Sequence, residues 1–148
     1  MSRRIYLDTS VISALFDERT PERQEMTLRA WDLIKECDVY ISDVVAEELQ
    51  MATSALLARF NEVTAGFNVI DTTDEARELA DAYVKQGIFP DKYYDDALHV
   101  AIASVNGIGL LLSWNFKHLV KLKTRRLVSV VNTLKDYIPV EIIAPPEL

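Results

Sequence analysis

The sequence lacks the features of secreted and membrane-spanning proteins. Cys37 is its only cysteine, so no internal disulfide or cysteine metal pair can form. The first apolar run is broken at Asp8, too early for the core of a signal peptide or for a membrane span. We therefore expect a soluble protein that stays in the reducing cytoplasm where it is made.

Positive charge is also scarce, because 16 Lys and Arg residues face 23 Asp and Glu residues and give a net charge of −7. This balance argues against a protein that holds nucleic acid on a broadly basic surface. It does not exclude a metal-dependent site, since carboxylates around a divalent cation count as negative in the sequence but are neutralised when the cation binds. The positive side chains cluster at Arg3 and Arg4 and again at Lys117, His118, Lys121, Lys123, Arg125 and Arg126. This clustering fits either a solvated basic face or a nucleic-acid contact.

Length and patterning predict one domain over residues 1–148. The chain has 148 residues, is 49% hydrophobic, and contains no internal repeat, low-complexity tract or Gly/Ser-rich linker. Such a chain is large enough to bury a single core but short for two independent ones. We therefore look for one functional site.

Apolar segments of strand length alternate with segments of helical periodicity. Strands are expected at 5–7, 39–41, 67–70 and 108–113, with a possible further strand at 127–130 and an apolar segment at 140–143. Helices are expected after Asp8, from Pro21 to Ile34, after Ser42, and at 54–64, 73–85, 91–105 and 133–137. Strands that are apolar throughout and are separated by helices indicate a parallel sheet buried on both faces. The fold class predicted is therefore α/β, a three-layer α/β/α arrangement with a central parallel sheet.

Acidic residues follow several of these strands or begin buried helices. Asp8 ends the first strand, Glu47 and Glu48 lie in the helix after the second, and Asp95 and Asp96 precede the small apolar run 97–103. Ligands of parallel α/β sheets bind outside the carboxyl ends of the strands, where these acids are expected to converge. A hard divalent cation is the simplest partner for several converging carboxylates, and it suits hydrolysis of phosphate esters.

Other interpretations remain open for each of these residues. Asp8 and Asp96 can be helix caps, and Glu47 and Glu48 can be surface charges. Thr9 and Ser10 are interpreted first as caps of the first helix, and Ser10 can additionally hydrogen-bond Asp8 or a phosphate. His99 can touch the site but is interpreted first as a satisfied core histidine. Trp114 and Phe116 can stack on a base, although in a chain this small they are more often core.

Four segments together resemble the signature of the PIN-domain nucleases. They are residues 5–10 (IYLDTS), 41–49 (ISDVVAEEL), 95–101 (DDALHVA) and 111–116 (LLSWNF). Each segment is weak alone, but their order, spacing and strand or helix context match across nearly the whole chain. The resemblance implies a PIN-like fold and Mg²⁺- or Mn²⁺-dependent cleavage of single-stranded RNA. It also implies the role of a VapC-like toxin, a cognate antitoxin that occludes the site, and a homodimer.

The resemblance assigns roles residue by residue. Asp8, Glu48 and Asp96 are the implied metal ligands and catalytic acids; Glu47 is the alternative to Glu48, and Asp95 either binds a second ion or caps the helix. In the fourth segment Ser113, Asn115 and His118 stand where many members have Thr, Asp and another acid, so a second ion would be held weakly. Asn115 is kept as a catalytic candidate. Four residues are candidates for substrate contact: Ser10, Ser113, Lys117 and His118.

Two rival functions compete with this interpretation. A non-catalytic PIN-like module that binds RNA or protein is favoured by the missing fourth acid and by the net negative charge. A small Mg²⁺-dependent phosphatase on a related sheet is disfavoured, because Thr9 and Ser10 follow Asp8 where an Asp-x-Asp nucleophile would be required.

Overall fold

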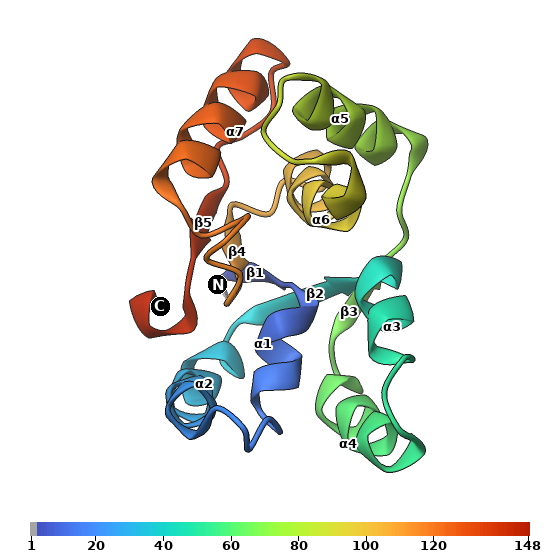
Figure 1. The fold of residues 1–148 in the computed structure, drawn as a ribbon, viewed down its shortest axis with the longest axis vertical. Helices are drawn as coiled ribbons and strands as arrows, with labels where there is room; N and C mark the ends of the chain where they lie inside the picture. The colour runs from blue at the N-terminus through green and yellow to red at the C-terminus, as the bar shows by residue number, and fades with distance from the viewer. Residues whose placement is uncertain (1–2) are drawn as a thin grey trace.

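A five-stranded parallel sheet forms the centre of the computed structural model, which describes residues 3–148. The strands run in the spatial order β3-β2-β1-β4-β5 (Figure 1). Their bounds are β1 Arg4–Leu7, β2 Asp38–Ser42, β3 Asn68–Ile70, β4 Leu110–Leu112 and β5 Glu141–Ile143. The predicted α/β fold with a central parallel sheet is therefore confirmed.

The order of the parallel strands changes direction at β1, because β2 and β3 lie on one side of it and β4 and β5 lie on the other. From β1 the chain moves outward to β2 and β3, then returns to the other side of β1 to form β4 and β5. Tyr6 of β1 lies opposite Tyr40 on one side and Leu111 on the other. Beyond the strand, the Asp8 amide still donates a hydrogen bond to the Leu112 carbonyl, with N and O 3.2 Å apart. The carboxyl ends of β1 and β4 thus form a switch point, where parallel α/β sheets bind their ligands.

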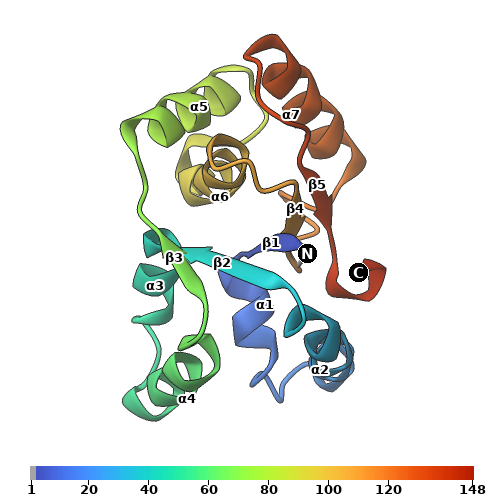
Figure 2. The ribbon, with the colours of Figure 1, turned by 180° about the vertical axis from the view of Figure 1, so that it is seen from behind.

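Helices cover both faces of the sheet, as Figures 1 and 2 show. On one side lie α1 and α2 with α4, and on the other lie α5, α6 and α7 (Figure 1). Helix α3 follows β2 directly and contacts both α1 and α6. The helix bounds are α1 Thr9–Ala14, α2 Pro21–Ile34, α3 Asp43–Leu49, α4 Ser54–Thr64, α5 Asp74–Lys85, α6 Tyr94–Val105 and α7 Leu122–Leu134, with 3-10 turns η1 Asp91–Tyr93 and η2 Pro145–Glu147.

Helix α6 is the most deeply buried helix, and its composition explains why. Residues 97–104 are all buried, and four of them are Ala or Ser, whose small side chains let the helix pack closely. Its first turn nevertheless carries Asp95 and Asp96, which the positive end of the helix dipole favours. The buried helix therefore brings an acid toward the carboxyl edge of the sheet.

Most of the expected elements are confirmed within one to three residues, but the segment after residue 121 is not. The predicted strand at 127–130 and the predicted short helix at 133–137 are wrong, because helix α7 occupies residues 122–134. Its buried positions Thr124, Val128 and Val131 recur every three or four residues, which is helical spacing. The β-branched run around Val128 suggested a strand, but one-sided packing of the helix outweighs that weak intrinsic preference. The segment at 140–143 supplies strand β5.

In the described part of the chain, no helix is long and apolar enough to cross a membrane.

Candidate active site

Asp8 lies at the switch point of the sheet, at the N-cap position of α1. Its side chain is 4% exposed and caps no helix amide. Instead, the hydroxyls of Ser10 and Ser113 each donate a hydrogen bond to one of its two carboxylate oxygens. Ser10 also accepts from the Trp114 amide, with N and Oγ 2.8 Å apart, so both serines are fixed by the segment after β4. Asp8 is thus held rigidly between the ends of β1 and β4.

Glu48, rather than Glu47, points from α3 toward Asp8. Glu47 is exposed, whereas Glu48 Oε1 accepts hydrogen bonds from Thr9 Oγ1 at 2.9 Å and from His99 Nε2 at 2.9 Å. Helix α3 begins directly after β2, with Ser42 at its N-cap accepting a bond from the Val45 amide. This cap fixes the helical register that turns Glu48 inward.

Asp96 is the third acid, presented by the first turn of α6. It is half-buried, whereas its neighbour Asp95 is exposed. Asn115 Nδ2 donates to Asp96 Oδ2 at 3.3 Å, and Asn115 Oδ1 accepts the His118 amide hydrogen bond at 3.0 Å. The two neighbours thus orient the Asn115 amide so that its nitrogen faces Asp96.

His99 connects the acids to the interior of the protein. It lies one helical turn after Asp96, is 2% exposed, and uses both ring nitrogens. Nδ1 is 2.7 Å from the Tyr6 hydroxyl, which in turn is 2.8 Å from Ser42 Oγ. When His99 is neutral, Nε2–H donates to Glu48, Nδ1 accepts from Tyr6, and Tyr6 accepts from Ser42. When His99 is protonated, Nδ1–H donates to the Tyr6 hydroxyl instead.

The charges of these groups influence one another. Burial, together with the charges of Asp8 and Glu48, raises the pKa of Asp96 from 3.8 to about 6. Burial also raises the pKa of Asp8, against the opposing charge of His99. Burial acts to raise the pKa of Glu48, but the hydrogen bond and charge of His99 outweigh it and lower the pKa. Conversely, burial acts to lower the pKa of His99, but Glu48, Asp8 and Asp96 together raise it.

These carboxylates have the donor chemistry of a site for a hard divalent cation. All three offer oxygen ligands, and within residues 3–148 neither Asp8 nor Asp96 forms an ion pair with Lys or Arg. No three Asp, Glu, His or Cys side chains of residues 3–148 converge as a ready-made metal site. The reason is visible in the hydrogen bonds, since Asp8, Glu48 and Asp96 each face a Ser, Thr, His or Asn partner. Asp8, Glu48 and Asp96 therefore fit a cation by the chemistry of their oxygen donors.

The other predicted site residues fall into two groups. Ser10 and Ser113 bind Asp8, and this placement corrects the interpretation of Thr9 and Ser10 as caps, because α1 begins at Thr9 and both side chains point to acids. Lys117 and His118 instead line a cavity beside the acids.

The two aromatic candidates for base stacking differ in burial. Trp114 is a core residue, 7% exposed, and donates its indole N–H to Thr27 Oγ1. Phe116 packs edge-on against Trp114 but is 49% exposed.

Sequence reasoning missed Tyr6 and Ser42 as parts of the site. Tyr6 carries a polar hydroxyl inside an otherwise apolar strand, and this was the available signal, since buried hydroxyls require partners. Nothing in the sequence indicated that the partner would be His99, which is 93 positions away.

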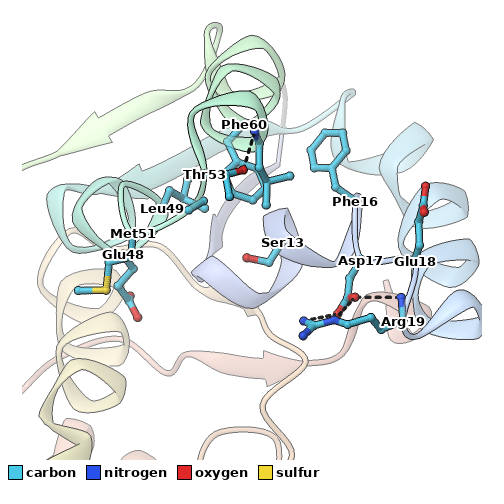
Figure 3. Close-up of a pocket in the computed structure, with 12 residues that line it drawn as sticks. Ser13, Phe16, Asp17, Glu18, Arg19, Glu48, Leu49, Met51, Thr53 and Phe60 are labelled. Carbon is cyan, nitrogen blue, oxygen red and sulfur yellow. Dashed lines mark hydrogen bonds and ion pairs between the residues drawn. The ribbon is translucent and has the colours of Figure 1, made fainter.

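A groove of about 550 Å³ runs from Glu48 along α1, α3 and α4 (Figure 3). Glu48 and Met51 lie at one end, and Phe16 lies toward the other, with its ring centroid 5.6 Å from that of Phe60 (Figure 3). The Met51 side chain is 89% exposed. Of the three acids, Glu48 therefore opens onto a partly apolar surface.

Comparison with known proteins identifies the class of this fold and site. The PIN domain family model matches residues 5–117, which include every acid described above, and the chain belongs to the PIN domain family. No curated protein matches the sequence significantly.

Solved structures share the fold at low sequence identity. One is VapC20 of Mycobacterium tuberculosis, a sarcin-ricin loop cleaving toxin, with TM-score 0.56 and 20% identity over 76% of this chain and 92% of that one. Another is VapBC2 of Rickettsia felis bound to a promoter DNA fragment, with TM-score 0.58 and 13% identity over 95% and 98%. A third is VapBC-5 of M. tuberculosis, a member of the VapBC toxin–antitoxin family, with TM-score 0.55 and 19% identity over 95% and 98%.

Proposed function

We propose that this protein is a Mg²⁺- or Mn²⁺-dependent endoribonuclease that cleaves single-stranded RNA, and that it acts as the toxin of a toxin–antitoxin pair. The observation that carries the proposal is the group of three acids at the switch point of a PIN-domain sheet, of which, within residues 3–148, only Glu48 has an ion-pair partner, His99, and none is paired with Lys or Arg. One histidine cannot neutralise three neighbouring acids, so the remaining negative charge is unfavourable in a buried site unless a cation joins them.

Each residue of the site has a defined task in this proposal. Asp8, Glu48 and Asp96 would hold one divalent ion, which when bound supplies an activated water and neutralises charge on the phosphoryl oxygens. Ser10 and Ser113 orient Asp8, and Asn115 orients Asp96. Water attacks the phosphorus in line, the bond to the 3′ oxygen breaks, and the products carry a 5′-phosphate and a 3′-hydroxyl.

The proposal includes a cognate antitoxin and a homodimer. Support for an antitoxin comes from the fold shared with toxins of VapBC pairs. The groove that begins at Glu48 has apolar walls suited to a partner segment that would cover the acids (Figure 3).

Cleavage of a labelled single-stranded RNA tests the nuclease proposal. Purified protein is expected to cut in Mn²⁺, to stop when EDTA is added, and to lose cleavage when Asp8 is replaced by Asn. The Asp8→Asn variant, purified in parallel, controls for a contaminating nuclease. RNA binding without cutting on several substrates would favour the non-catalytic PIN-like module instead.

Growth arrest tests the toxin proposal separately. Expression of the wild-type chain alone is expected to stop growth of a bacterial host, and Asp8→Asn is expected to relieve the arrest at equal protein levels. Normal growth at high levels of active nuclease would contradict the toxin role while leaving the nuclease proposal standing.

A further inference from the structure

A second cavity, of about 260 Å³, lies beside the acids on the same edge of the sheet. Its walls come from the turn between α5 and α6, the segment after β4, and the first turns of α7. Gly87 lies in one wall with φ +76°, and an added Cβ there would meet no atom within 4 Å, so the wall is open at this point. The lining residues are Gly87, Ile88, Pro90, Lys117, His118, Lys121, Lys123, Thr124 and Leu127.

The cavity is strongly basic, although the protein as a whole carries a net charge of −7. Lys117, Lys121 and Lys123 all line it, and within residues 3–148 none of them forms an ion pair. The sequence explains why, since no acidic residue occurs between Asp96 and Asp136. The charge of these lysines is therefore available to a ligand.

His118 adds a hydrogen-bonding group that has no partner. Its ring stacks on Tyr93, with centroids 3.9 Å apart and planes inclined by 33°. Its Nε2 atom is shielded from solvent and makes no hydrogen bond within the described residues. Burial and the charges of Lys117, Lys121 and Lys92 lower the pKa of His118.

The cavity is connected to the acids by a short path. The His118 amide bonds to Asn115, and Asn115 bonds to Asp96. Tyr93 lies just before α6, three residues before Asp96. The cavity and the acids are therefore neighbouring sites that one polyanionic strand can contact together.

We propose that this cavity binds a backbone phosphate of the RNA strand next to the phosphate that is cut. The proposal rests on the proposed ribonuclease function and adds to it a second, metal-independent contact made by Lys117, Lys121 and Lys123. Lysine binds phosphate as a point charge, without reading the base. The pocket thus holds the position of the strand relative to Asp96 and leaves sequence preference to other contacts.

Two double variants with the same change of charge test this pocket. Lys121→Gln with Lys123→Gln removes two of its charges. Arg29→Gln with Lys35→Gln removes two exposed charges, one in α2 and one directly after it, and α2 lies on the other side of the sheet (Figure 1). Affinity for a labelled single-stranded RNA is measured by fluorescence anisotropy in EDTA at several KCl concentrations. Thermal unfolding of both variants checks that each is folded.

The pocket variant is expected to bind RNA about tenfold more weakly than the control variant at low salt. Its plot of log affinity against log salt should be shallower by about 0.7, the contribution of one single-strand phosphate. Equal affinities of the two variants would overturn the proposal. The proposal would also be overturned if inorganic phosphate bound the wild type but not the pocket variant and yet did not compete with RNA. The cavity would then bind a free anion and not the RNA backbone.

Metal-dependent cleavage is assayed in parallel, so that the two proposals can fail separately. Weakened RNA binding in a chain that never cuts would support binding of the RNA backbone by the pocket, while rejecting the nuclease and with it the position of the pocket next to a scissile phosphate. Normal RNA cleavage together with unchanged RNA affinity in the pocket variant would support the nuclease and reject the pocket.

Discussion

Replacing Asp96 by Asn is expected to make the metal-free protein more stable while it abolishes RNA cleavage. The folded-state pKa of about 6 lies above the model value of 3.8, so ionised Asp96 destabilises the folded protein at neutral pH. A shift of this size corresponds to at most about 3 kcal/mol, and partial exposure of Asp96 reduces the expected gain to about 1–2 kcal/mol. Asn has nearly the same shape and can accept the hydrogen bond from Asn115 without a charge.

Thermal unfolding in EDTA at several pH values measures this effect. The stability cost of Asp96 is absent below pH 3.8 and grows as pH rises toward 6, so Asp96→Asn should gain its full advantage above about pH 6. In a chain of this length the expected gain amounts to a rise in melting temperature of roughly 3–8 °C. A lower melting temperature at pH 7.5 would show that the Asp96 carboxylate is stabilising without metal.

Cleavage is expected to change in the opposite direction. The loss of one ligand charge should lower the rate in Mn²⁺ by about a hundredfold or more, since metal-assisted charge stabilisation contributes several kcal/mol. Asp95→Asn is the matched control, because Asp95 is the adjacent acid of the same helix turn but is exposed. A similar loss of cleavage in both variants would contradict the assignment of Asp96.

The sequence predicted the fold largely because the hydrophobic pattern is unambiguous in the centre of the molecule. Residues 5–7 of β1 and the whole of β4 are buried and largely apolar, and α6 is buried without interruption from residue 97 to residue 104. Prediction failed in α7, at the outside of the structure, where a β-branched segment has an exposed side. Its helical state depends on packing against α5, which is a tertiary contact that local patterns do not show.

The positions of the acids could be predicted, but their partners could not. A carboxylate that follows a buried strand must lie at the edge of the sheet, and this placed Asp8 correctly. The choice of Glu48 over Glu47 depended on the resemblance to PIN domains, and the inward turn of α3 supports it. The hydrogen bonds of Asp8 to Ser113 and of Glu48 to His99 join residues 105 and 51 positions apart, and they form only once the layers have packed.

His99→Leu is expected to destabilise the protein by about 3 kcal/mol at pH 6. Leucine would leave the Tyr6 hydroxyl buried without its His99 partner and would remove the partner that lowers the pKa of Glu48. A buried polar group that loses its partner costs about 1–3 kcal/mol, and more if it is charged. Urea unfolding of the metal-free protein measures the change in the free energy of unfolding.

The pH dependence of this loss identifies its origin. The folded-state pKa of His99 is raised above the model value of 6.5, so the stabilisation is fully present below pH 6.5 and is lost as pH rises through the folded-state pKa. The difference between wild type and His99→Leu should therefore shrink at alkaline pH. A difference that stays constant from pH 6 to pH 10 would indicate lost packing alone.

Two milder variants separate the roles of the ring nitrogens. Tyr6→Phe removes the hydroxyl that bonds both His99 Nδ1 and Ser42 Oγ and should cost about 1–2 kcal/mol, whereas His99→Gln keeps an N–H donor on the side chain next to Glu48. If His99 positions Glu48 for metal binding, Mn²⁺ affinity measured by electron paramagnetic resonance should fall about tenfold or more in His99→Leu and recover partly in His99→Gln. Equal Mn²⁺ affinity in all three variants would restrict His99 to a structural role, because unfolding would then be the only property that it changes.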